Sequence, residues 1–184
     1  MNLLNDKLSA GISYYNVKVS NTVLQISPEE YVQEGEQNNS GFEANITANP
    51  IEGLNIIAGY SYNDSKLENA NGNEFEGRRP ESAGPRNLAN LWASYKFMEG
   101  KLEGFGLGFG GNYASKNEIF SRNGAGTFTL PEYTVINGSI FYSSQDFLIT
   151  LKLDNITNKE YYKGWSTISP QKPRVFSIGA TYNF

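Results

Sequence analysis

The sequence holds one glycine pattern that could bind a nucleotide phosphate. Residues 106–111 read Gly-Leu-Gly-Phe-Gly-Gly, which matches the dinucleotide fingerprint G-x-G-x-x-G. That fingerprint works only where a strand turns into a helix whose amino terminus holds the pyrophosphate. Because Leu107 and Phe109 continue the alternation of a strand, we predict no nucleotide site. The glycines instead give the strand a bare face, which fits either close approach of other backbone or packing around large neighbours such as Trp92.

Two groups of charged residues could also do chemistry. The carboxylates Glu29, Glu30, Glu34 and Glu36 could chelate calcium, but they lack the D-x-[DN]-x-[DN]-G spacing, so a solvated acidic loop and no metal site are predicted. Lys152 and Asp154 lie two residues apart in an alternating stretch and therefore share a face. A salt bridge between them is expected, and no nucleophile with a base can be assembled.

Three arginines form the other candidate binding group. Arg78, Arg79 and Arg86 flank the segment 80–85 in the longest loop. Guanidinium groups suit anionic ligands and the phosphates of surface lipid. The alternative interpretation is that these charges only keep the loop soluble.

Composition removes several classes of function. The chain has neither cysteine nor histidine, which excludes disulfide scaffolds, thiolate zinc sites and Cys or His nucleophiles. Its net charge of −4 and pI near 5.0 argue against a nucleic-acid partner, which requires a basic face. We predict that the chain is not an enzyme and needs no cofactor.

The elements that must position any site are strands. The last stretch, residues 173–184, alternates apolar and small or polar residues up to the closing Tyr182 and Phe184. In a strand such alternation produces one apolar and one polar surface. Similar alternation predicts eight strands in all: 7–24, 41–49, 54–66, 87–97, 104–120, 133–143, 147–161 and 173–184. Near Tyr15 the apolar residues change from one face of the strand to the other, so we expect either a bulge or a strand that rises out of lipid at this point.

The connections predict the environment of these strands. Short links at 49–53, 98–103 and 144–146 alternate with long polar segments at 27–39, 68–86, 121–132 and 163–172. Transmembrane barrels have short turns on one side, long loops on the other, and an outward apolar band flanked by aromatic girdles. No run of about eighteen apolar residues could form a membrane helix, and the mean hydropathy is −0.47. We predict an all-β, antiparallel, up-and-down transmembrane barrel sheet spanning residues 1–184 in a bacterial outer membrane.

Several segments, in this order, resemble the C-terminal part of TonB-dependent outer-membrane receptors of the ferric-siderophore branch. They are 35–43 (GEQNNSGFE), 53–62 (GLNIIAGYSY), 85–95 (PRNLANLWASY), 130–133 (LPEY), 153–162 (LDNITNKEYY), 173–174 (PR) and the closing 182–184 (YNF). The resemblance covers nearly the whole chain. It implies a barrel of about twenty-two strands, of which this chain holds a part.

The resemblance also implies partners and sites. Such receptors bind iron–siderophore complexes outside and import them with energy passed through TonB, so these partners are expected through the missing parts of the receptor. Outer-membrane lipid, lipopolysaccharide and the barrel-assembly machinery are expected too. Arg78, Arg79 and Trp165 are ligand-facing loop candidates, and Tyr182 and Phe184 are the candidate membrane-insertion signal.

The chain departs from the family's pattern. It has no plug domain and no TonB-box segment, and the residues that follow Met1 do not form a signal peptide. We therefore expect that residues upstream of Met1 are missing and that the chain is a fragment that does not transport alone. One alternative is a self-contained eight-stranded outer-membrane barrel with a structural or adhesion role, although its bare glycine face would leave voids. Another is a soluble β-sandwich, in which the apolar faces would cover one another.

Overall fold

The computed structural model describes residues 2–3, 7–27, 29–69, 76–121, 126–165 and 167–184. Its main element is one antiparallel sheet in the order β1-β2-β3-β4-β5-β6-β9-β10-β13. Apart from β1 (Asn2–Leu3), its strands are β2 (Leu8–Ser27), β3 (Glu30–Ala48), β4 (Leu54–Asn69), β5 (Asn87–Lys96), β6 (Phe105–Ala114), β9 (Tyr133–Ser143), β10 (Phe147–Asp154) and β13 (Val175–Tyr182). The predicted meander of eight long strands is confirmed.

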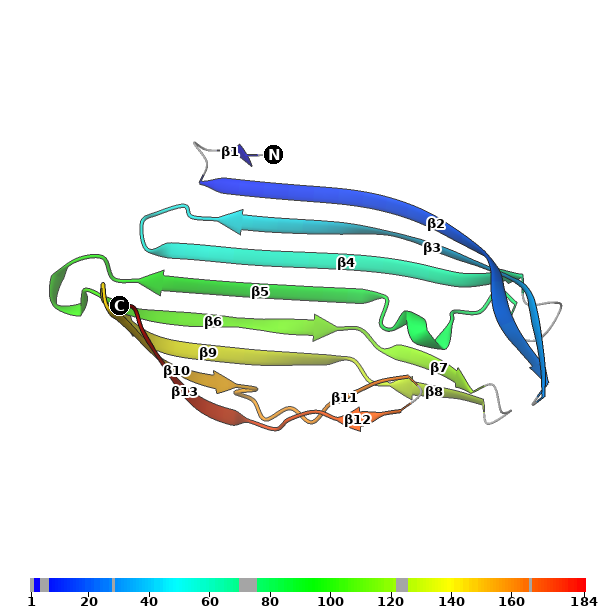
Figure 1. The fold of residues 1–184 in the computed structure, drawn as a ribbon. Helices are drawn as coiled ribbons and strands as arrows, with labels where there is room; N and C mark the ends of the chain where they lie inside the picture. The colour runs from blue at the N-terminus through cyan, green and yellow to red at the C-terminus, as the bar shows by residue number, and fades with distance from the viewer. Residues whose placement is uncertain (1, 4–6, 28, 70–75, 122–125, 166) are drawn as a thin grey trace.

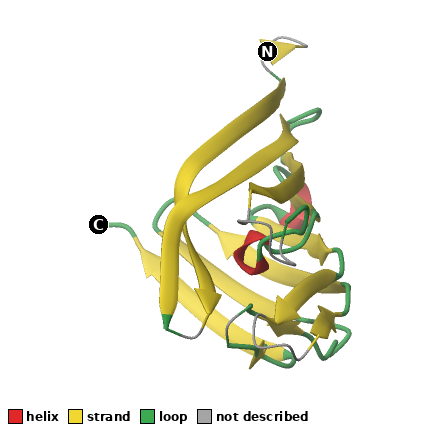
Figure 2. Ribbon diagram, turned by 90° about the vertical axis from the view of Figure 1, so that its right-hand side faces the viewer, coloured by secondary structure: helices red, strands yellow, loops and turns green. Residues whose placement is uncertain are grey.

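Apart from the link between β2 and β3, the connections alternate in length as predicted. Short turns join β3 to β4, β5 to β6 and β9 to β10, and the middle turn holds the 3-10 helix η2 (Gly100–Leu102). Longer segments carry the hairpin of β7 (Asn117–Ser121) with β8 (Gly126–Leu130), the pair of β11 (Tyr162–Lys163) with β12 (Ser169–Pro170), and the 3-10 helix η1 (Glu81–Ala83). Figure 1 shows the short turns at one end of the sheet and these additions at the other. Figure 2 shows that the sheet curves.

The two edges of the sheet do not meet. Within the described residues, β13 pairs only with β10, and β2 pairs with β3 along most of its length and with β1 at Leu8 and Ser9. The sheet therefore does not close into an eight-stranded barrel, as the structural or adhesion alternative required. It is an open, curved wall with one free strand edge on each side.

One face of this wall is apolar and uncovered; we call it the outward face. It carries Leu107, Ile140, Leu151 and Ile178, which pair in register across β6, β9, β10 and β13. Exposed fractions on this face reach 81% for Ile12, 61% for Phe109 and 71% for Ile178. No second layer covers these side chains among the described residues, so the β-sandwich interpretation is wrong. Among these residues no helix combines the length and the apolar character needed to cross a membrane.

Aromatic rows border the apolar band at both ends. Near the short turns, Phe105 and Tyr142 lie 4.8 Å apart between ring centroids, and Tyr142 and Phe147 lie 5.7 Å apart. On the other side of the apolar band, within β2, β3 and β4, the outward residues Tyr14, Phe42 and Tyr62 pair in register. Beyond this second row the outward face becomes polar, with Asn16, Ser40 and Asp64 followed by Lys18, Asn38 and Lys66. Such girdles around an apolar band are the signature of a transmembrane barrel wall.

Strand lengths agree with this boundary. The strands β5, β6 and β9 have 10 or 11 residues, which suits a tilted strand that crosses a bilayer. The strands β2, β3 and β4 have 20, 19 and 16 residues and rise past the second aromatic row. The prediction that residues 27–39 form a loop is therefore wrong from Glu30 onward. A hairpin in water has polar residues on both faces, so alternation gives no signal for it.

The structure decides between the two alternatives for one predicted strand detail and corrects two others. The register of β2 with β3 is continuous through Tyr14 and Tyr15, so the parity switch marks a strand leaving the lipid, and the register shifts begin only after Val19. β6 ends at Ala114, and residues 117–121 belong to the separate hairpin with β8, inside the expected loop 121–132. β10 ends at Asp154 because Asn155 takes a left-handed conformation with φ 53°.

Large side chains cover the bare glycine face of β6. Gly106, Gly108 and Gly110 are buried on the inner face, opposite the outward face. A Cβ on Gly106 would collide with the Phe141 ring, and one on Gly108 would lie 2.5 Å from the Trp92 indole. Of the two interpretations offered by the sequence, the structure supports packing around large neighbours.

The contrast between two inner-face glycines gives a test of this packing. A Cβ at Gly110 would meet the Leu91 carbonyl oxygen and lie 2.8 Å from the Trp92 Cα, whereas a Cβ at Gly179 would meet nothing within 4 Å. Gly110→Ala should lower the free energy of unfolding by about 2 kcal/mol, because backbone cannot yield cheaply. Gly179→Ala should leave it unchanged or raise it by about 0.5 kcal/mol. Heat-modifiable gel migration across a urea series measures both, and equal stability of the two variants would contradict the account.

Candidate functional site

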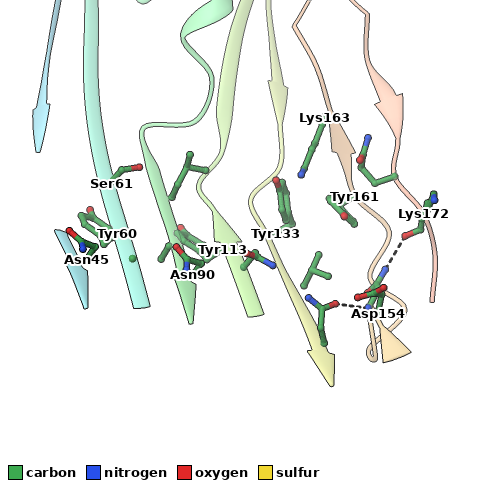
Figure 3. A pocket seen from close by; sticks show the side chains of 18 of the residues that line it. Asn45, Tyr60, Ser61, Asn90, Tyr113, Tyr133, Asp154, Tyr161, Lys163 and Lys172 are labelled. Atoms are coloured by element: carbon green, nitrogen blue, oxygen red, sulfur yellow. Dashed lines mark hydrogen bonds between the residues drawn. The ribbon is translucent and has the colours of Figure 1, made fainter. Parts of the chain in front are cut away.

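A polar groove lies along the inner face of the sheet. It has a volume of about 970 Å³ and runs from Ser13 on β2 across β3, β4, β5, β6 and β9 to the segment 154–175. Its polar lining consists of Ser13, Glu43, Asn45, Tyr60, Ser61, Asn90, Asn112, Tyr113, Tyr133, Asn137, Asp154, Asn155, Tyr161, Lys163, Gln171 and Lys172. Figure 3 shows labelled members of this set on neighbouring strands. The groove is the candidate functional site.

Sheet register brings a row of amides into the groove. Asn45 pairs with Gly59, Gly59 with Asn90, and Asn90 with Asn112, so all four residues lie at one level of the inner face. The amides of Asn45 and Asn90 lie across neighbouring glycines, because a Cβ on Gly11 or Gly59 would be only 2.5 Å from their oxygens. Each amide offers both hydrogen-bond donors and an acceptor. The row can therefore bind polar ligand groups of either kind.

A buried asparagine fixes the far wall of the groove. Asn155 is only 2% exposed and begins the segment between β10 and β13. Its backbone N–H donates to Asn137 Oδ1 at 2.9 Å, and its Nδ2 donates to the carbonyls of Lys159 and Lys172 at 2.9 and 3.3 Å. Its Oδ1 accepts the Lys159 N–H at 2.8 Å. These bonds tie both ends of the segment to β9.

Two tyrosines and a lysine form a compact group on this wall, which we call the tyrosine–lysine cluster. The rings of Tyr133 and Tyr161 lie 4.5 Å apart between centroids. Lys163 Nζ lies 5.7 Å from the Tyr133 centroid and 5.8 Å from the Tyr161 centroid. Figure 3 shows the three side chains beside one another. The cluster offers planar apolar surface next to a positive charge.

Arg79 holds the loop between β4 and β5 against the sheet. Its Nη1 donates to the Asn63 carbonyl at 2.9 Å, and its Nη2 donates to Asn63 Oδ1 at 3.0 Å. Its Nε donates to the Gly84 carbonyl at 3.2 Å, and Nη2 also reaches the Ala83 carbonyl at 3.3 Å. Burial lowers the pKa of this guanidinium, and the charge of Arg86 lowers it further. Arg79 therefore has a structural role, because it fastens the loop to β4. A contact between Arg79 and a ligand stays a prediction.

The other predicted residues lie outside the groove lining. Arg78 and Trp165 are exposed on their loops, and Trp165 has an exposed fraction of 50%. Tyr182 and Phe184 make an edge contact at 5.0 Å at the end of β13, where both are exposed. Their roles in ligand contact and in membrane insertion stay predictions.

The remaining charged candidates are ion-paired or solvated. Lys152 and Asp154 form the expected salt bridge, with 2.9 Å between Nζ and Oδ1. Of the four candidate calcium ligands, Glu29, Glu30 and Glu34 are exposed, while Glu36 lies 2.9 Å from Lys18. Across the described ranges, no group of three or more acidic residues is placed to hold a metal ion.

Sequence reasoning missed the residues that do line the groove. No role was predicted from the sequence for the amides Asn45, Asn90 and Asn112 or for Tyr133, Tyr161, Lys163 and Lys172. One available signal was that Asn45, Asn90 and Asn112 each lie on the inward face of a predicted strand. Their common level depends on the register between strands, which the sequence did not specify.

Comparison with known proteins places this wall in a family. The family model described as "TonB dependent receptor-like, beta-barrel" matches residues 1–158. The ferric-pyoverdine M114 receptor PbuA of Pseudomonas sp. strain M114 is 32% identical over 162 residues, which are 83% of this chain and 19% of that receptor. The ferrichrome outer membrane transporter/phage receptor of Escherichia coli K12 is 27% identical over 154 residues, 80% of this chain and 20% of that protein. The prediction that the chain is not an enzyme agrees with these names.

Solved structures give the same fold. The ferripyoverdine receptor of the Pseudomonas aeruginosa outer membrane, solved with ferripyoverdine bound, superposes with a TM-score of 0.81 at 18% identity. The match covers 100% of this chain and 26% of that receptor. The chain spans about a fifth of the length of the curated relatives above.

The hydrogen bonds of the Asn155 side chain predict how much this residue contributes to the free energy of unfolding. Asn155→Ala should lower the free energy of unfolding by about 3 kcal/mol, because three side-chain hydrogen bonds are lost and alanine is strained at positive φ. Asn155→Asp keeps the Oδ1 acceptor but replaces the Nδ2 donor with a carboxylate oxygen that faces the Lys159 and Lys172 carbonyls, so it should lose at least as much. Urea titration followed by heat-modifiable migration measures both. An Asn155→Ala variant as stable as the parent would contradict the assignment.

Proposed function

The chain belongs to the TonB dependent receptor-like β-barrel family of the bacterial outer membrane, and from this premise we propose that it is a C-terminal portion of the barrel of an iron–siderophore import receptor. In this proposal the outward face contacts outer-membrane lipid and lipopolysaccharide. The inner face lines the path of the ferric siderophore, and TonB supplies the energy through other parts of the receptor.

The free edges of the sheet support a larger barrel. Unpaired backbone N–H and C=O groups cost several kcal/mol each in lipid, so a membrane sheet has no stable open edge. In the part of the chain that the structure describes, both β2 and β13 present such an edge over most of their length. Additional strands of the same receptor, on both sides, would pair these groups. The chain covers only about a fifth of each relative's length, which also supports a larger barrel.

The position of the groove is the observation that best supports a transport function. A polar groove of about 970 Å³ lies on the inner face of a wall whose other face is apolar. A polar path beside a lipid-facing surface is what the passage of a hydrophilic chelate requires. The relatives are named for ferrichrome and ferric pyoverdine, which are iron chelates of this kind. Insertion of the barrel would involve the barrel-assembly machinery, with Tyr182 and Phe184 as the recognition signal.

Iron uptake by cells tests this proposal. Cells that express the gene encoding this chain, starved of iron, should accumulate radioactive iron from at least one ferric siderophore. Uptake should fall at least about tenfold when the gene or TonB is deleted, because the family depends on TonB energy. Complementation with the gene is the control. Accumulation that is unchanged in both deletions, across catecholate, hydroxamate and mixed siderophores, would refute the proposed function.

A further inference from the structure

The segment that connects β10 to β13 differs in charge from the rest of the chain. Residues 155–174 contain four basic residues (Lys159, Lys163, Lys172 and Arg174) and one acidic residue (Glu160), which gives a net charge of +3. The whole chain has a net charge of −4, so the other residues together carry −7. The far wall of the groove is therefore a cationic segment in an acidic protein. Such a reversal attracts anions locally and repels them elsewhere.

This positive charge is placed on one side of the groove. Lys163 and Lys172 both line it, on the wall that Asn155 holds in place. Of the two lining carboxylates, Asp154 is paired with Lys152 at 2.9 Å. The other, Glu43, lies on β3, four strands away from β9 in the sheet order. The groove is thus positive at its β9 and β10 side.

Aromatic surface lies at the same place as the charge. Tyr133 and Tyr161 line the groove with rings 4.5 Å apart, and Lys163 Nζ lies within 6 Å of both centroids. Aryl rings of a ligand can stack on or against such a pair, and the ammonium group can pair with negative oxygens on the same ligand. A neutral, aliphatic chelate would gain little from either contact. The combination therefore discriminates between classes of iron chelate.

We propose that the tyrosine–lysine cluster, together with Lys172, is a binding subsite that selects anionic, aryl-bearing ferric chelates of the catecholate class over neutral hydroxamate chelates. This inference rests on the proposed function and deepens it, because it specifies the ligand class that the groove takes. Lys163 supplies charge, and Tyr133 and Tyr161 supply the aromatic surface.

Binding to outer membranes tests the subsite. Membranes from cells that express the gene are incubated without energy with radioactive ferric tris-catecholate, which is anionic, or ferric tris-acetohydroxamate, which is neutral. The catecholate complex should bind more tightly. Lys163→Gln should weaken its binding about tenfold and change binding of the neutral complex less than about twofold. Raising the salt concentration should weaken binding of the anionic complex alone.

Two variants serve as controls. Lys163→Arg keeps the charge over the rings and should retain most of the binding. Lys116→Gln removes another exposed lysine, which pairs with Glu118 at 2.8 Å outside the groove, and should have no effect. Heat-modifiable migration confirms that each variant is folded.

The outcomes separate the subsite from the receptor function. Equal binding of the two complexes, preference for the neutral one, or indifference to Lys163→Gln would overturn the subsite, while TonB-dependent uptake of any ferric siderophore would still support the receptor function. Loss of TonB dependence for every siderophore overturns the receptor function, and the subsite falls with it. Preference for the anionic complex that disappears in Lys163→Gln and persists in Lys163→Arg supports the subsite.

Discussion

Backbone hydrogen bonding in lipid is the constraint on which the rest of the structure depends. No water reaches the hydrocarbon region, so every N–H and C=O group must bond to a neighbouring strand. The antiparallel ladder from β2 to β13 satisfies this requirement along its interior. The ladder also fixes register, and register decides which side chains lie at the same level. The two aromatic rows and the amide row of the groove are consequences of this register.

The same constraint separates the two faces by chemistry. Alternation along each strand sends Leu107, Ile140 and Leu151 outward and Gly108, Ser139 and Lys152 inward. The outward face needs no partner within the protein because lipid is its solvent, which explains why so few hydrophobic side chains are buried among the described residues. The inner face meets water and can carry amides, hydroxyls and charges. A binding groove is therefore possible without any conventional hydrophobic core.

The sequence predicted the membrane-crossing strands well and the site poorly, for one physical reason. Alternation reports on a strand with different solvents on its two faces, as in β5 or β9, so these strands and their short turns were predicted correctly. Alternation does not reveal a strand whose two faces both meet water, as in residues 30–39 of β3 and in β8 (Gly126–Leu130). The groove depends on inter-strand register and on the Asn155 turn, both of which require tertiary structure. The segment 153–162, which contains Asn155, was nevertheless among those that resemble the family.

Spin labelling tests the central claim that the outward face touches lipid. The chain has no cysteine, so single-cysteine variants can be labelled selectively. Adjacent positions form matched pairs: Ile140 with Ser139, and Leu151 with Thr150. In membranes, labels at Ile140 and Leu151 should collide with lipid-soluble oxygen, and labels at Ser139 and Thr150 should not show this lipid exposure. Labels at Ile140 and Leu151 that are shielded from oxygen, as if packed against protein, would contradict the account.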